Sequence, residues 1–237
     1  MFIIHHNDAD GRCAAAIAGR WAKEQTPEFN RIVFHEQDYK DPCPVDLINN
    51  DEKVVIVDFS FKPPEMEMIR GKTGDIVWCD HHATAEAYEY DLPGLRDFTD
   101  KGLCGAEVTW KFFFPATPVP NGVTMLGEYD SWRHTDPDAF AYYEGLKMID
   151  QAPFQGDWEN IFNELTGFDV EAIVDDGQLC MNYRDNYCDS MRSSFGFETE
   201  IDGHKAYALN IARFGSQAFG EEFKNYPLCI MFIFDGR

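Results

Sequence analysis

Basic residues are scarce in this chain of 237 residues. Lys and Arg number 20 against 42 Asp and Glu, which gives a formal net charge of −22. Affinity for long nucleic acid comes largely from Lys and Arg side chains that contact phosphates. The composition therefore argues against binding of long double-stranded nucleic acid. It leaves small phosphorylated substrates open, because a bound cation attracts an anion locally.

Long apolar runs and paired cysteines are also missing. No apolar run approaches the roughly 20 residues that cross a bilayer, and Met1 leads through a short apolar run into His and Asp without a signal peptide. The seven cysteines are scattered, odd in number and form no CxxC pair, which favours buried thiols over a disulfide framework. We therefore expect a soluble protein of the reducing cytoplasm, with no membrane partner.

Apolar runs alternate with helix-length segments through the first half of the chain. We expect strands over 2–5, 31–35, 53–58 and 75–80, and helices over 11–25, 64–70, 84–89 and 104–114. Strands separated by helices predict right-handed βαβ units. The fold class is therefore α/β, with a mainly parallel sheet flanked by helices.

The second half of the chain has a different pattern. Helical periodicity extends over 137–165, and a long polar helix is expected over 170–194. Strands follow at 197–201, 205–211 and 228–234, with a helical segment over 216–224. We predict a first domain over 1–168, a linker helix over 169–195 and a small, partial α+β domain over 196–237. The chain stops where a hairpin turn would begin, at 235–237, so the last domain is expected to be abbreviated or truncated.

Acidic and imidazole side chains stand at the ends of these elements. They are His6, Asp8, Asp10, Asp58, Asp80, His81, His82 and Asp130. Taken singly, Asp8 and Asp10 suggest Asx turns or helix N-caps, and Asp58 suggests an ordinary turn. Taken together they gather where parallel strands end, which is the edge where sites form in open α/β sheets. Oxygen and nitrogen ligands in this pattern predict a site for two divalent cations.

At these residues the sequence resembles the DHH phosphoesterase superfamily, which includes RecJ-type exonucleases, oligoribonucleases, cyclic-dinucleotide phosphodiesterases and family II pyrophosphatases. The matching motifs, in the family's order, are His6-x-Asp8-x-Asp10-Gly11, Asp58, Asp80-His81-His82 and Asp130. The resemblance covers residues 1–135 well. It implies a DHH catalytic domain, followed by a linker helix and a smaller substrate-binding domain.

The resemblance also implies roles for single residues. Asp58 would bridge two Mn²⁺ ions, with Mg²⁺ or Co²⁺ as substitutes. One ion would be held by His6, Asp8 and Asp58, and the other by Asp10, Asp58, His81 and Asp130. His5 stays an alternative to His6, because the family's His often lies further from the first Asp.

The remaining motif residues would assist the reaction. His82 would contact the phosphoryl oxygens or assist proton transfer. Together with the ligands Asp58 and His81, it makes up the set of predicted catalytic residues. Asp80 would orient the imidazoles without contacting the metal itself, with direct ligation as the alternative.

Substrate binding is expected from residues beyond the ligands. Arg133 and His134 follow Asp130 and are predicted to bind phosphate, with Trp132 stacking on a base; a buried Trp and a solvated Arg are the alternative. Arg213 lies between a predicted strand and a helix N-terminus, where a terminal phosphate can bind. The family's GGGH segment, which helps to hold substrate, is absent from this sequence.

The leading hypothesis is a metal-dependent phosphoesterase. It would hydrolyse phosphodiester bonds of short oligonucleotides or dinucleotides through a two-metal-activated water. An inorganic pyrophosphatase is the first alternative, although it would need a cluster of Lys and Arg around a small anion. A non-catalytic nucleotide-binding module on the same fold is the second. The sequence leaves monomer and dimer open.

Overall fold

The computed structural model describes residues 1–25, 31–154, 156–163 and 170–234. The chain divides into two compact units, Met1–Gly177 and Gln178–Arg237. The predicted domain boundary at 168/169 and the predicted hairpin turn at 235–237 lie outside the described residues.

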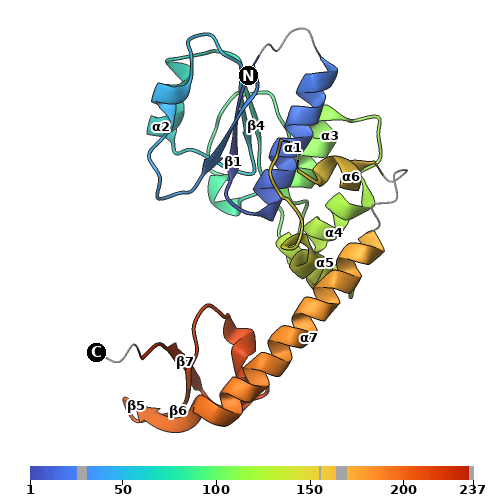
Figure 1. Cartoon of the computed structure of the whole chain (residues 1–237). Helices are drawn as coiled ribbons and strands as arrows, with labels where there is room; N and C mark the ends of the chain where they lie inside the picture. Colours follow the sequence, from blue (N-terminus) through green and yellow to red (C-terminus); the bar gives the residue numbers. More distant parts are fainter. Residues whose placement is uncertain (26–30, 155, 164–169, 235–237) are drawn as a thin grey trace. The chain divides into compact units, whose positions relative to one another are not determined.

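A four-stranded parallel sheet forms the centre of the first unit (Figure 1). Its strands are β1 (Phe2–His6), β2 (Val33–Gln37), β3 (Val54–Val57) and β4 (Ile76–Cys79), in the spatial order β2-β1-β3-β4. Every residue of β3 and β4 is buried, as expected for parallel strands that are covered on both faces. The carboxyl ends of all four strands lie along one edge of the sheet.

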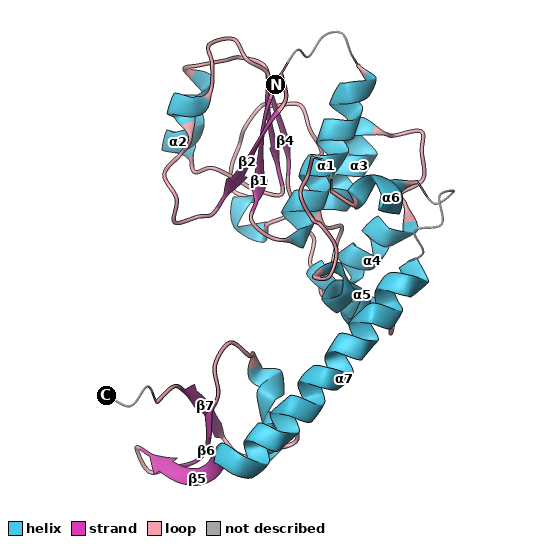
Figure 2. Ribbon diagram, in the orientation of Figure 1, coloured by secondary structure: helices cyan, strands magenta, loops and turns pink. Residues whose placement is uncertain are grey.

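Helices cover both faces of this sheet (Figure 2). On one face lie α1 (Ala9–Glu24) and α3 (Gly105–Phe113), whose buried side chains share a core with Ile3, Val55 and Val57. On the other face lies α2 (Pro63–Arg70), which packs against Phe2 and Ile4 through Met66 and Ile69. The alternation of side chains along each strand produces these two cores.

Three further helices lie wholly within the described part of the first unit: α4 (Asn121–Asp130), α5 (Ala139–Leu146) and α6 (Trp158–Phe162). They extend the core on the α1 side through Leu126, Tyr142 and Trp158. Short 3₁₀ turns lie at Val45–Leu47 and Ala83–Ala85. The prediction of a helix over 84–89 is therefore wrong in extent. After β4 the structure has the 3₁₀ turn at Ala83–Ala85 in place of that helix.

The second unit contains a three-stranded sheet. The long helix α7 (Val170–Phe195) leads into β5 (Gly196–Ile201), which pairs antiparallel with β6 (His204–Asn210). Strand β7 (Leu228–Phe232) adds to β6 in parallel. A 3₁₀ turn at Ser216–Phe219 and the short helix α8 (Glu222–Asn225) stand between β6 and β7. The predicted α/β fold with a later, small α+β region is confirmed.

All seven cysteines lie in the described part of the chain, and all are free thiols. None of the helices in the described residues is both long enough and apolar enough to cross a membrane.

Candidate metal centre

Strand β1 and helix α1 bring the first two candidate ligands together. His6 is the last residue of β1, and Asp8 is the N-cap of α1, where its Oδ1 accepts a hydrogen bond from the Gly11 N–H at 2.9 Å. Its other oxygen, Oδ2, lies 2.8 Å from His6 Nδ1. Burial raises the pKa of Asp8, but the approach of His6 and the Gly11 N–H outweigh burial and lower that pKa to about 2. Asp8 is therefore a carboxylate at neutral pH.

Asp10 joins the start of α1 to the start of α3. Its carboxylate is buried and accepts hydrogen bonds from the backbone N–H groups of Gly105, at 2.6 Å, and Ala106, at 2.9 Å. Those N–H groups belong to the first turn of α3 and have no partner within the helix, so an anion is favoured there. This anchor leaves Asp10 Oδ2 at 3.6 Å from His81 Nε2.

Asp58 follows β3 in a left-handed backbone conformation, with φ of 52°. Few residues other than glycine adopt this region, and Asp tolerates it better than most. The Asp58 N–H donates to the Cys79 carbonyl at 2.9 Å, which fixes the turn against β4. A Cβ atom at Gly105 would approach Asp58 Cβ and Oδ1 to 2.5 Å. Glycine at 105 therefore makes room for a carboxylate that the backbone turns into the site.

Asp80 organises the two histidines after β4. Its Oδ1 accepts hydrogen bonds from the backbone N–H groups of His81, at 2.8 Å, and His82, at 3.3 Å, and lies 2.8 Å from His82 Nδ1. Its Oδ2 accepts from the Ser60 hydroxyl, which in turn accepts from Trp78 Nε1 at 3.0 Å. Burial raises the pKa of Asp80, but the hydrogen bonds from His82 and Ser60 outweigh burial and lower it. These contacts hold the ring of His82 and the backbone of both histidines, and the orienting role of Asp80 stays a prediction.

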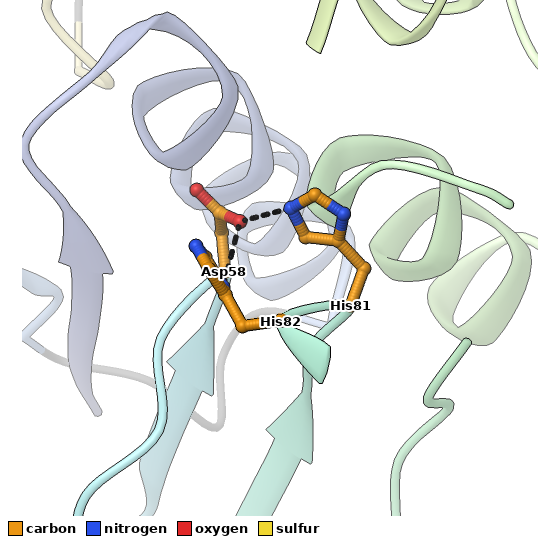
Figure 3. Close-up of side chains that lie close together, drawn as sticks. All are labelled: Asp58, His81 and His82. Atoms are coloured by element: carbon orange, nitrogen blue, oxygen red, sulfur yellow. Dashed lines mark ion pairs between the residues drawn. The ribbon is translucent and has the colours of Figure 1, made fainter. Parts of the chain in front are cut away.

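His81 stands at the centre of the cluster. Its Nε2 lies 3.2 Å from Asp58 Oδ1, 3.3 Å from Asp130 Oδ2 and 3.6 Å from Asp10 Oδ2. Figure 3 shows one carboxylate oxygen of Asp58 facing both His81 and His82. His82 Nδ1 is 3.8 Å from this oxygen. On the opposite side, Asp58 Oδ2 lies 3.9 Å from His6 Nδ1. One oxygen of Asp58 thus faces His6, and the other faces His81 and His82.

The structure gathers the candidate ligands into three groups whose ligand atoms lie within 4.8 Å of one another. The groups are His6, Asp8 and Asp58; Asp10, His81 and Asp130; and Asp58, His81 and His82. Asp58 belongs to two of them. The first group is the set that the family resemblance implies for one ion, and the second contains three of the four residues implied for the other, without Asp58. Ligation itself stays a prediction.

The electrostatics of Asp58 fit a cation site. Both of its carboxylate oxygens are buried, and neither has a hydrogen-bond partner among the described residues. Burial, followed by the charges of Asp10 and Asp8, raises the pKa of Asp58 well above its ordinary value. The same causes raise the pKa of Asp130 to about 8. A buried carboxylate without donors is costly unless a proton or a metal ion neutralises it, so this donor set fits divalent cations.

His5 lies outside the cluster. Its Nδ1 is 2.7 Å from the carbonyl oxygen of His6, and burial lowers the pKa of His5 to about 4. Successive side chains of a strand point to opposite faces, so only one of the two imidazoles can face Asp58. Of the two alternatives, the structure places His6 among the ligand atoms.

The segment after Asp130 makes contacts that the sequence did not reveal. Arg133 forms ion pairs with Glu107, at 3.0 Å, and Glu128, at 3.2 Å. These buried pairs count against its predicted contact with phosphate. His134 lies against the rings of Trp132, at 5.0 Å, and Phe140, at 4.6 Å, while Trp132 is largely exposed. Phosphate binding by Arg133 and His134 and base stacking by Trp132 stay predictions.

Arg213 belongs to the second unit. It follows β6 in a left-handed conformation, with φ of 65°, shortly before the 3₁₀ turn at Ser216–Phe219. Its contact with a terminal phosphate stays a prediction.

Sequence reasoning missed a cavity of about 550 Å³ that opens beside Asp8. Its lining includes Arg12, Tyr143 and Lys147, together with the amide of Gln151. Arg12 directly follows the motif of Asp8 and Asp10, so its position in the sequence could have indicated that it lies near the site. Tyr143 and Lys147 are distant in sequence, and no local pattern indicates that they line this cavity. The cavity places two cationic side chains next to the cluster in a strongly acidic protein.

Comparisons with known proteins identify the family of this chain. The model of the DHH family, N-terminal domain, matches residues 1–126. An uncharacterized protein, R106, of Acanthamoeba polyphaga mimivirus is 24% identical over 141 residues, which are 59% of this chain and 32% of that protein. The chain thus spans about a third of the length of this curated relative.

Two solved structures share the fold. An uncharacterized protein from Helicobacter pylori G27 superposes with a TM-score of 0.50 at 12% identity, over 98% of this chain and 82% of that chain. The DHH domain of a protein described as a member of a family of ribosomal proteins gives 0.50 at 14% identity, over 98% and 71%. Because the family model covers more than half of the sequence, this chain belongs to the DHH family, within the DHH phosphoesterase superfamily.

Proposed function

We propose that this protein is a metal-dependent hydrolase that cleaves phosphodiester bonds of short oligonucleotides or dinucleotides. The observation that carries the proposal is the carboxylate of Asp58. It is buried between two groups of ligand atoms, and its oxygens have no hydrogen-bond partner in the described part of the chain. Such a carboxylate is suited to bridging two cations.

The metal ligands follow from the two groups. His6, Asp8 and Asp58 would hold one ion. Asp10, His81 and Asp130 would hold the other, together with Asp58, which lies 3.2 Å from His81 Nε2. Mn²⁺ is the proposed ion, since it accepts mixed carboxylate and imidazole ligands. When bound, such a pair of cations supplies a nucleophilic water near neutral pH and neutralises charge on the phosphoryl group.

His82 is placed to handle a proton. Its Nδ1 is held by Asp80 at 2.8 Å, which fixes the ring and leaves Nε2 for the substrate. Burial lowers the pKa of His82, but the Asp80 carboxylate outweighs burial and raises it. Protonated His82 donates a hydrogen bond to a phosphoryl oxygen or a proton to the leaving oxygen.

The cavity beside Asp8 supports a small anionic substrate. A volume of about 550 Å³ falls in the range of small-molecule sites. Arg12 is pre-positioned there, because its Nε donates to Glu36 at 2.8 Å and a terminal nitrogen donates to the Asn7 carbonyl at 3.2 Å. Tyr143 and Ile149 add apolar surface that pyrophosphate alone does not need.

The second unit completes the proposal. The region of β5, β6 and β7 is the proposed substrate-binding domain. Arg213 is its proposed contact with a terminal phosphate. The guanidinium group suits this contact because it donates two parallel hydrogen bonds to phosphate.

The proposal is tested with purified protein, Mn²⁺ and four substrates: the dinucleotide pApA, a five-nucleotide RNA, long single-stranded DNA and pyrophosphate. We expect hydrolysis of the two short nucleotides, little activity on long DNA or pyrophosphate, and none after chelation with EDTA. Preferential hydrolysis of pyrophosphate would identify a phosphoanhydride hydrolase instead. Nucleotide binding without hydrolysis of any substrate would identify a non-catalytic module.

A further inference from the structure

Tyr39 presents an aromatic ring at the carboxyl edge of the first sheet, directly after β2. The ring stacks on Phe59, with centroids 4.6 Å apart and an interplanar angle of 24°. Phe59 is buried at 2% exposure, whereas Tyr39 is 53% exposed. A buried ring therefore supports an aromatic side chain that remains largely open to solvent.

The loop that carries Tyr39 is held in place. The amide of the buried Gln37 donates hydrogen bonds to the carbonyl oxygens of Asp38, at 3.1 Å, Asp41, at 3.2 Å, and Pro42, at 3.4 Å. The side chain of Asn7 also donates to the Asp38 carboxylate at 3.2 Å. A loop that is ordered before binding loses less conformational entropy when a ligand arrives.

Tyr39 also lies beside the candidate metal centre. Its ring centroid is 5.5 Å from that of His6 and 6.0 Å from that of His82. A group that stacks on Tyr39 would therefore lie next to His82, the residue that we propose as the hydrogen-bond donor to the phosphoryl oxygens.

The surroundings of Tyr39 favour a flat, uncharged group over a phosphate. A cavity of about 170 Å³ adjoins the ring, and aromatic side chains form part of its wall. They are Tyr39, Phe59, Phe61 and Tyr88. Lys62 is the one basic residue of that lining, against the acidic Asp38, Asp41 and Glu65. An anion would be repelled here, while a nucleobase would gain stacking contacts.

We propose that Tyr39, supported by Phe59, stacks on the nucleobase adjacent to the cleaved phosphate. This inference rests on the proposed function, and it identifies nucleotides as the substrate class of the same site. Aromatic stacking accepts every base, because each has a π-face. Tyr39 thus selects nucleotides over pyrophosphate without selecting a particular sequence.

The test compares Tyr39→Ala with Tyr39→Phe, which keeps the ring, and Tyr39→Leu, which keeps only apolar bulk. The substrates are pApA and the same dinucleotide without its bases. For pApA, Tyr39→Ala and Tyr39→Leu should raise KM about 10-fold with little change in kcat, and Tyr39→Phe should stay within about 2-fold of wild type. On the abasic substrate all three variants should equal wild type. Equal losses on both substrates, or a loss confined to kcat, would overturn the inference.

A second measurement separates this inference from the proposed function. A dinucleotide that carries 2-aminopurine is titrated into the protein with Ca²⁺ in place of Mn²⁺, and fluorescence is followed. Stacking should quench the fluorescence in wild type and Tyr39→Phe, and not in Tyr39→Ala. Ring-dependent quenching without hydrolysis in Mn²⁺ would refute the phosphoesterase and keep the stacking site. Hydrolysis with the same quenching in Tyr39→Ala would do the reverse.

Discussion

The two sheets of this protein use the ends of their strands in different ways. Asp58 follows β3 of the four-stranded sheet, and Asp202 stands in the turn after β5 of the three-stranded sheet. Both adopt the left-handed conformation, with φ of 52° and 51°. Asp58 is 1% exposed beside other carboxylates, whereas Asp202 is exposed. The same residue in the same backbone conformation is a turn residue in water and a candidate metal ligand when buried.

The difference arises from how each sheet is covered. Helices cover both faces of the first sheet, so β3, β4 and the Asp58 carboxylate that follows β3 are removed from water. Many residues of β5 remain exposed. Among the described residues, all three groups of candidate ligands lie in the first unit. Matched substitutions in the two units therefore separate the effect of burial from the effect of residue type.

The largest effect is expected from Asp58→Asn compared with Asp202→Asn. Asparagine tolerates the left-handed conformation, so both variants should fold, as judged by circular dichroism. Asp58→Asn removes the bridging charge and should lower kcat by at least about 10³-fold with Mn²⁺. Asp202→Asn should match wild type. Near-normal activity of Asp58→Asn with a full complement of metal would refute its bridging role.

A smaller effect is expected from breaking ion pairs. Arg133→Met leaves the buried Glu107 without its cation and should lower the free energy of unfolding by about 3 kcal/mol. Lys205→Met removes the exposed pair with Glu198 and should leave the denaturation midpoint unchanged. Urea denaturation measures both. Equal losses of unfolding free energy in the two variants would show that burial does not determine how much an ion pair contributes to stability.

Glycine substitutions extend the comparison to the backbone. Gly105→Ala would bring a Cβ to 2.5 Å from Asp58, so we expect a loss of about 2–3 kcal/mol together with weaker Mn²⁺ binding. Gly203→Ala, at φ of +79° with no atom within 4 Å of the added Cβ, should lose only about 1 kcal/mol from backbone strain. Thermal denaturation with and without Mn²⁺ separates the two. An unaltered metal affinity in Gly105→Ala would contradict the packing of Gly105 against Asp58.

The smallest effect concerns pH. Without metal, burial and neighbouring charges raise the pKa of folded Asp130 from an ordinary value of 3.8 to about 8. The folded state then binds more protons than the unfolded state between these values, so its stability is full below about pH 4 and falls as pH rises to about 8. From about pH 6.5 to 8 the metal-free protein should lose about 2 kcal/mol.

With Mn²⁺ present, the folding stability should instead rise over the same pH range, because the carboxylate ligands bind cations in their deprotonated form. The control is Asp130→Asn, which removes one titrating group and should make the metal-free profile shallower, while the buried Asp58 still titrates. A metal-free profile that rises over the same range would show that the carboxylates of the first unit are not neutralised by protons.

Much of the first unit could be predicted from its sequence. Parallel strands impose a common carboxyl edge, so motifs that follow strands were expected to meet, and Asp10, Asp58 and His81 lie together as that reasoning requires. Each of these positions is set by the strand or helix start that carries it. Local sequence determines such elements, and topology then brings them together.

Tertiary contacts account for what the sequence could not reveal. Arg133 pairs with Glu107, which lies 26 residues away, and no local pattern marks that partner. Tyr39 stands in a loop, where its support by Phe59 depends on how two strand ends meet. The left-handed turn at Asp58 depends on the space that Gly105 leaves in another element. Such features follow from packing and not from periodicity.

The central claim is that the carboxyl edge of the first sheet holds two divalent ions with Asp58 between them. Crystals grown with Mn²⁺, measured at the manganese absorption edge, test it directly. We expect two anomalous peaks ~3.5–4 Å apart, one beside His6 and Asp8 and the other beside Asp10, His81 and Asp130. An active protein whose manganese lies elsewhere, or whose Asp58 contacts no ion, would contradict it.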